Sequence, residues 1–133
     1  MTDVREFGAV GDGKTDDTEA IQHAIDEGVG RVDFPGGDYL ITRTLLVDLA
    51  KVGRTGIDGA GGTAKLVMAG AGPAIFLKAT HARTADPSGF RPEEWKNERM
   101  PIVRDIEIEG RHARADGIRI VGVMQPTLSG VLI

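Results

Sequence analysis

Hydrophobic residues recur at two different periods along the chain, and the period changes near residue 30. Ile21, Ala24 and Ile25 recur at helical spacing, with Ala20 beside them. This stripe is narrow, so it predicts a helix that lies on a core rather than inside one. His23 lies off the stripe, and we expect it to be solvated.

The ends of this helix carry their own signals. Asp16 and Glu19 form an Asp-x-x-Glu capping arrangement, and Thr15 is a rival N-cap. Gly28 predicts the C-terminal end. Asp17 is expected to interact only with the helix dipole, so replacing it with Ala should cost about 1 kcal/mol or less.

Beyond residue 30 the pattern changes to short β runs separated by turns. No Asn-Gly hairpin signal lies between these runs, which favours a coil of parallel strands. The predicted strands cover residues 31–34, 38–42, 44–48, 55–58, 65–68, 74–79, 103–109, 117–123 and 127–133.

A weak repeat accompanies these strands. Ile57, Ile106 and Val131 each lie close to a turn glycine. The step from Ile106 to Val131 falls within the repeat length of solenoids, about 20–30 residues. The step from Ile57 to Ile106 is about twice as long. We attribute the surplus to a long polar loop over residues 80–102.

Residues 8–15 (GAVGDGKT) match the phosphate-loop pattern G-x-x-x-x-G-K-[ST]. This match makes a nucleotide-binding protein a remote alternative. The carboxylates of Asp12, Asp16 and Asp17 oppose it, because a phosphate needs positive potential there. A second helix, which a doubly wound nucleotide-binding fold requires, is not predicted after residue 28.

Residues 3–13 (DVREFGAVGDG), 15–18 (TDDT) and 20–25 (AIQHAI) resemble the N-terminal block of the pectate-lyase-like right-handed parallel β-helix superfamily. Related blocks occur in polygalacturonases, alginate epimerases and phage tailspikes. Residues 30–41 (GRVDFPGGDYLI) resemble the first coil of these proteins. The resemblance implies an all-β solenoid, a right-handed parallel β-helix with one N-terminal capping α-helix that shields the edge of the first coil.

The expected organisation is a single β-helix domain over residues 1–133. Residues 1–30 form an N-terminal strand and the capping helix, and residues 31–133 form about three coils with the loop at 80–102. The chain stops in the apolar run 131–133 without a C-terminal cap. We therefore expect an N-terminal fragment of a longer protein, which self-associates through its uncapped C-terminal coil.

The composition limits which classes of partner and cofactor are expected. The net charge of −4 disfavours nucleic acid, and the absence of cysteine excludes a thiolate metal site. No apolar run is long enough for a membrane span, so no membrane partner is expected. No cofactor or metal ion is predicted. The chain shows no signal peptide, whereas the resemblance implies an extracellular or cell-surface location.

The strand around residue 107 carries the best candidates for catalysis. Alternation places Ile106 and Ile108 inward, and Asp105, Glu107 and Glu109 on one outer face. Alternate residues on a strand lie roughly 6–7 Å apart, which suits the two carboxylates of a glycoside hydrolase. Glu107 and Glu109 are therefore candidate catalytic residues. The competing interpretation is an ordinary solvated strand.

Three further residues are candidates for substrate binding. His112 and Arg119 would bind an anionic sugar, or they are ordinary surface charges. Trp95, the only tryptophan, would stack on a sugar ring, or it pins the long loop. The leading expectation is the N-terminal part of a carbohydrate-active protein that acts on an acidic polysaccharide by lyase or hydrolase chemistry, inactive as this fragment. The alternative is a non-catalytic adhesion, tailspike or scaffold module.

Overall fold

A computed structural model describes residues 2–27, 30–79, 101–123 and 126–133. The helix stop predicted at Gly28 and most of the loop predicted at 80–102 lie outside these residues. In chain order the elements are β1 (Thr2–Asp3), the 3-10 helix η1 (Val4–Phe7), β2 (Asp12–Asp16), α1 (Thr18–Asp26), β3 (Arg31–Asp33), β4 (Gly37–Ile41), β5 (Leu45–Asp48), α2 (Leu49–Val52), β6 (Gly56–Asp58), β7 (Ala64–Met68), β8 (Gly72–Lys78), β9 (Ile102–Arg104), β10 (Ile106–Gly110), β11 (Ala115–Val121) and β12 (Thr127–Ser129).

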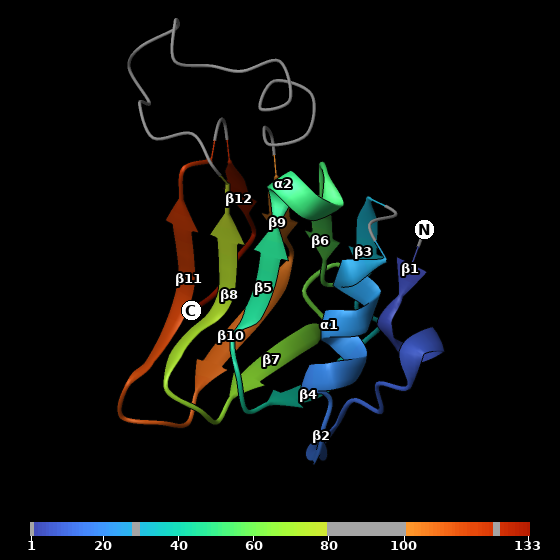
Figure 1. Cartoon of the computed structure of the whole chain (residues 1–133). Helices are drawn as coiled ribbons and strands as arrows, with labels where there is room; N and C mark the ends of the chain where they lie inside the picture. The colour runs from blue at the N-terminus through green and yellow to red at the C-terminus, as the bar shows by residue number, and fades with distance from the viewer. Residues whose placement is uncertain (1, 28–29, 80–100, 124–125) are drawn as a thin grey trace, which may run out of the picture.

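The strands form three parallel sheets whose members come from successive turns of the chain. Sheet A has the order β1-β3-β6-β9-β12, sheet B the order β10-β7-β4-β2, and sheet C the order β11-β8-β5. Consecutive strands enter different sheets, and each strand pairs with its counterpart about 25 residues later or after the long insertion. The fold is therefore the predicted all-β solenoid, a right-handed parallel β-helix (Figure 1).

The core lies inside the coils, where the three sheets face one another. Every second strand residue points inward, and most of these side chains are aliphatic. Ile57, Leu66 and Ile75 represent sheets A, B and C in one coil, and each is at most 1% exposed. The outward side chains of the three sheets are not needed for the core, so they can contact a ligand.

The N-terminal segment covers one end of this core. Ile21, Ala24 and Ile25 are fully buried on the inner side of α1, as the helical spacing predicts. β1 pairs with β3 at the end of sheet A, and β2 pairs with β4 at the end of sheet B. α1 packs beside β5, the first strand of sheet C (Figure 1). The predicted cap is confirmed, and it uses two short strands as well as the helix.

Residues 3–7 alternate between polar and apolar, which predicts a strand over this segment, but the N-terminal strand is shorter. Only Thr2 and Asp3 are extended, and the residues that follow form η1. The Asp3 carboxylate accepts a hydrogen bond from the backbone N–H of Arg5 at 2.8 Å, and Gly8 ends the turn in the left-handed region at a φ of 102°. The side chain of an N-terminal capping residue therefore overrides the alternating pattern.

The predicted strands at 103–109 and 127–133 are each interrupted by a corner. Asp105 has a φ of 55° and separates β9 from β10, while Gly130 has a φ of 62° and follows β12. The repeat register also needs correction, since Ile57 pairs with Val103 rather than aligning with Ile106. The Ile106-to-Val131 step is confirmed by the neighbouring bridge from Glu107 to Leu132.

Candidate functional site

The segment that matches a phosphate loop has a different structure. Lys14 and Thr15 lie in β2, which pairs with β4, and α1 begins only at Thr18. The Asp12 carboxylate accepts the backbone N–H groups of Lys14 and Thr15 at 2.9 and 2.8 Å. These bonds lower the pKa of Asp12, and the bond from the Thr15 N–H contributes most. The nucleotide interpretation is wrong, because a carboxylate occupies the donors that a phosphate would need.

The other two acidic residues of this segment are also structural. Asp17 is 1% exposed and accepts the backbone N–H groups of Val10 and Gly11 at 2.9 and 3.0 Å. The Asp16 carboxylate accepts hydrogen bonds from the Thr18 hydroxyl and N–H, and the first of these does most to lower its pKa. The prediction that Asp17 interacts only with the helix dipole is wrong, since it anchors the loop before β2.

The acidic strand β10 is paired with a cation. Glu107 and Glu109 are half-buried on the outer face of sheet B, and their carboxylates lie 3.8 and 3.5 Å from the Lys65 ammonium. Arg111 donates to Glu109 at 2.7 Å and, more than any other contact, lowers its pKa. Asp105 does not share this face, contrary to the prediction, because its positive φ places it at the corner before β10.

Sheet C carries an outward row that joins apolar and basic side chains. Leu46, Phe76 and Arg119 are cross-strand neighbours on β5, β8 and β11, which run side by side in Figure 1. The Arg119 guanidinium lies 5.1 Å from the centre of the Phe76 ring, and Leu46 is 38% exposed. This row offers an apolar surface beside a fixed cation.

His112 does not join either group. It lies in the turn between β10 and β11, where its Nδ1 atom accepts the backbone N–H of Arg114 at 3.0 Å. This contact is a local turn bond and supports the ordinary surface interpretation. Trp95, the remaining candidate, lies outside the described residues.

Two residues of these faces were missed from the sequence. Phe76 lies in the predicted strand at 74–79, between the inward residues Ile75 and Leu77, so alternation alone places it outward. Lys65 meets the glutamates only because β7 and β10 are adjacent. Sequence alternation is therefore sufficient to find Phe76, whereas Lys65 requires knowledge of the strand register.

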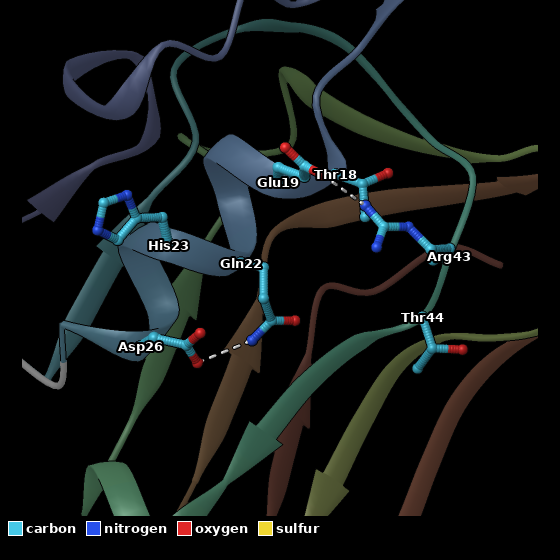
Figure 2. A pocket seen from close by; sticks show the side chains of 7 residues that line it. All are labelled: Thr18, Glu19, Gln22, His23, Asp26, Arg43 and Thr44. Carbon is cyan, nitrogen blue, oxygen red and sulfur yellow. Dashed lines mark hydrogen bonds and ion pairs between the residues drawn. The ribbon is translucent and has the colours of Figure 1, made fainter.

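A hollow of about 400 Å³ lies beside α1 (Figure 2). Gln22 and the charged side chains that line it already have partners. Gln22 donates to Asp26 at 2.9 Å, and Arg43 lies 3.5 Å from Glu19. His23, which also lines it, is exposed, as predicted, and lies 3.5 Å from Glu27. We assign this hollow to the junction between the cap and the first coil.

Within the described part of the chain, no group of three or more His, Asp or Glu side chains is arranged to hold a metal ion. None of the helices described is both long enough and apolar enough to span a bilayer.

The three stacked sheets and their helical cap define a pectate-lyase-like parallel β-helix. A family model for rhamnogalacturonase A/epimerase, pectate lyase-like proteins matches residues 1–106. The chain belongs to this family.

Curated relatives match a short segment. Alginate lyase 7 of Azotobacter vinelandii is 56% identical over 43 residues, which cover 29% of this chain and 5% of that protein. Plasmin and fibronectin-binding protein A of Streptococcus pneumoniae is 54% identical over 43 residues, covering 29% of this chain and 6% of that protein. The aligned segment is thus a small part of each of these larger proteins.

Solved structures match almost the whole chain. ORF18 of Geobacillus virus E2 has a TM-score of 0.72 at 23% identity, and the match covers 98% of this chain and 25% of that one. The A-module of the Azotobacter vinelandii mannuronan C-5 epimerase AlgE4 has a TM-score of 0.65 at 21% identity, covering 98% of this chain and 37% of that one. These similarities show the fold, and the chain spans about a quarter to a third of their length.

Proposed function

We propose that the chain is the N-terminal part of a carbohydrate-active β-helix protein that acts on an acidic polysaccharide. In this proposal residues 1–30 cap the solenoid and residues 31–133 carry its first coils. The family match and the names of the curated relatives, which include an alginate lyase and mannuronan C5-epimerases, support a polysaccharide ligand.

The contact between Arg119 and Phe76 carries the proposal for the binding face. A sugar presents an apolar C–H face and, in an acidic polysaccharide, a carboxylate. Phe76 and the exposed Leu46 suit the first, and the guanidinium of Arg119 suits the second. No hydrogen bond or ion pair joins Arg119 to another described residue, so its donors are available for a ligand.

Glu107 and Glu109 are weaker candidates for catalysis. A general acid needs a raised pKa at neutral pH, whereas the pKa of Glu109 is lowered by Arg111 and Lys65. Lys65 also lies beside Glu107. We therefore assign binding rather than cleavage to the described coils. Pairing of these carboxylates also favours the second candidate function, a non-catalytic adhesion, tailspike or scaffold module.

Calorimetric titration of the chain with polygalacturonate and with alginate tests the binding face. Arg119→Gln and Phe76→Ser should each weaken binding roughly tenfold, the equivalent of one charge-assisted hydrogen bond or stacking contact. Arg114→Gln removes one charge from the nearby turn and serves as the matched control. Equal losses in Arg114→Gln and Arg119→Gln, or no binding by the parent chain, would contradict the proposal.

Activity distinguishes the two candidate functions. Incubation with both polymers, followed by assays of reducing ends and unsaturated products, should show no turnover by this chain. Turnover that disappears in Glu107→Gln or Glu109→Gln would make the acidic strand catalytic.

A further inference from the structure

The outer face of sheet A contains a second hollow, of about 270 Å³. Gly56 lies between Arg31 and Ile102 in the register of β3, β6 and β9. A Cβ atom at Gly56 would meet no atom within 4 Å. The missing side chain therefore opens the space. The hollow is lined by Arg31, Gly56, Ile57, Asp58, Ile102 and Arg104.

Asp58 holds two arginines at the rim of this hollow. One carboxylate oxygen accepts the Nη2 and Nε donors of Arg104 at 3.0 and 3.2 Å, and Nη2 of Arg31 at 3.4 Å. The other oxygen accepts the backbone N–H of Ala60 at 3.0 Å. Asp58 is 8% exposed. Burial acts to raise its pKa, but the hydrogen bonds from Arg104 and Ala60 and the charges of Arg104 and Arg31 together lower it. The carboxylate stays ionised and orients both guanidinium groups.

The arginines retain donors for a ligand. A guanidinium has five N–H groups. Arg104 directs its Nε and Nη2 atoms to Asp58, while Arg31 directs Nε to Asp33 and Nη2 to Asp58. The Nη1 groups are not used in these bonds. The two side chains are 53% and 51% exposed, so a second carboxylate can approach from the solvent side.

We propose that this hollow binds one hexuronate unit, separately from the face on sheet C. The apolar side of the sugar ring lies on Ile102 and the backbone of Gly56, and its carboxylate accepts hydrogen bonds from Arg31 and Arg104. The apolar floor favours a ring over a bare anion, since Ile102 is 38% exposed at this point. The choice of sugar rests on the proposed function, whereas the hollow and its arginines do not.

Gly56→Val tests the site by filling it. The φ of Gly56 is compatible with other residues and its Cβ position is open, so the variant should fold. Calorimetric titration with trigalacturonate should detect two sites in the parent. Gly56→Val should weaken one of them at least roughly tenfold, and Arg119→Gln should weaken the other.

Circular dichroism verifies the fold of Gly56→Val, and Arg104→Lys is a second variant. Lysine keeps the positive charge but lacks the planar guanidinium that donates two parallel hydrogen bonds, so binding at this site should again weaken. Two unchanged sites in both variants would overturn the inference. A single site, lost only in Arg119→Gln, would also overturn it while the proposed function stands. A single site lost only in Gly56→Val would support it and contradict the sheet C face.

Inorganic sulfate that competes as well as the trisaccharide would show an anion site without sugar recognition, and would overturn the inference.

Discussion

The side-chain carboxamide of Gln22 pairs with the backbone of Leu46 as a neighbouring β-strand would. Its Nε2 atom donates to the Leu46 carbonyl at 2.8 Å, and its Oε1 atom accepts the Leu46 N–H at 2.8 Å. Leu46 lies on β5, the edge strand of sheet C, and no strand of the described residues pairs with β5 on that side. Gln22 on α1 thus pairs with the backbone N–H and C=O of Leu46 at the edge of sheet C. In sheets A and B, the short strands β1 and β2 pair with this end of the sheet instead.

Replacing Gln22 with Met should expose this edge while keeping the length of the side chain. Two hydrogen bonds to Leu46 and one to Asp26 are lost at a partly solvated position, so unfolding free energy should fall by about 1 kcal/mol. Urea denaturation measures the change, and light scattering should show more self-association. Glu27→Gln, at the C-cap of the same helix, is the control. A variant as stable and as monodisperse as this control would show that the pairing does not protect the edge.

Asp17→Ala should destabilise the chain by about 2 kcal/mol, because it leaves the N–H groups of Val10 and Gly11 without their acceptor. Glu19→Ala removes an exposed carboxylate from the first turn of α1 and should cost about 0.5 kcal/mol. Thermal and urea unfolding of both variants measures the difference. Equal costs would mean that Asp17 contributes only through the helix dipole.

The ion pairs of Asp58 should make stability depend on pH. Its pKa in the folded chain is lowered from the ordinary value of 3.8, so the unfolded chain binds a proton more readily. The contribution is therefore present above pH 3.8 and is lost as pH falls through the folded pKa. Asp58→Asn should lower unfolding free energy by about 1–2 kcal/mol at pH 7.

The difference between parent and Asp58→Asn should shrink as the pH of the urea titrations falls below 3.8. Glu109→Gln, which removes a half-buried carboxylate from sheet B, should show a smaller difference at pH 7. A gap between parent and Asp58→Asn that is constant with pH would contradict the assigned ionisation.

Self-association through the last described coil remains a prediction. Leu132 and Ile133 are 63% and 70% exposed, which leaves apolar surface beside the final strands. Leu132→Lys should shift an oligomer toward monomer in light scattering at tens of micromolar protein. A monomeric parent, or an oligomer that the lysine leaves unchanged, would refute this mode of association.

Much of the fold is predictable because the N-terminal block is read from local signals. The helical stripe of Ile21, Ala24 and Ile25 and the short strands both follow from periodicity. The corners are harder, since Asp105 adopts a positive φ that a non-glycine residue rarely shows. α2 was also missed, because a one-turn helix has no period to detect.

The candidate sites depend more strongly on register than the fold does. Alternation correctly places Glu107 and Glu109 outward, but their pairing with Lys65 requires two strands distant in sequence to be adjacent. The same holds for the hollow at Gly56, whose walls come from three coils. A single sequence therefore identifies the outward residues, and tertiary structure selects which of them meet.

Amide chemical-shift mapping with trigalacturonate tests the central claim most directly, and a chain of 14.1 kDa is well suited to it. The largest shifts on sheets B and C should fall on sheet C, at Leu46, Phe76 and Arg119, with little change around Glu107 and Glu109. Shifts concentrated on the acidic strand of sheet B, or no shifts at millimolar ligand, would contradict a glycan-binding face on sheet C.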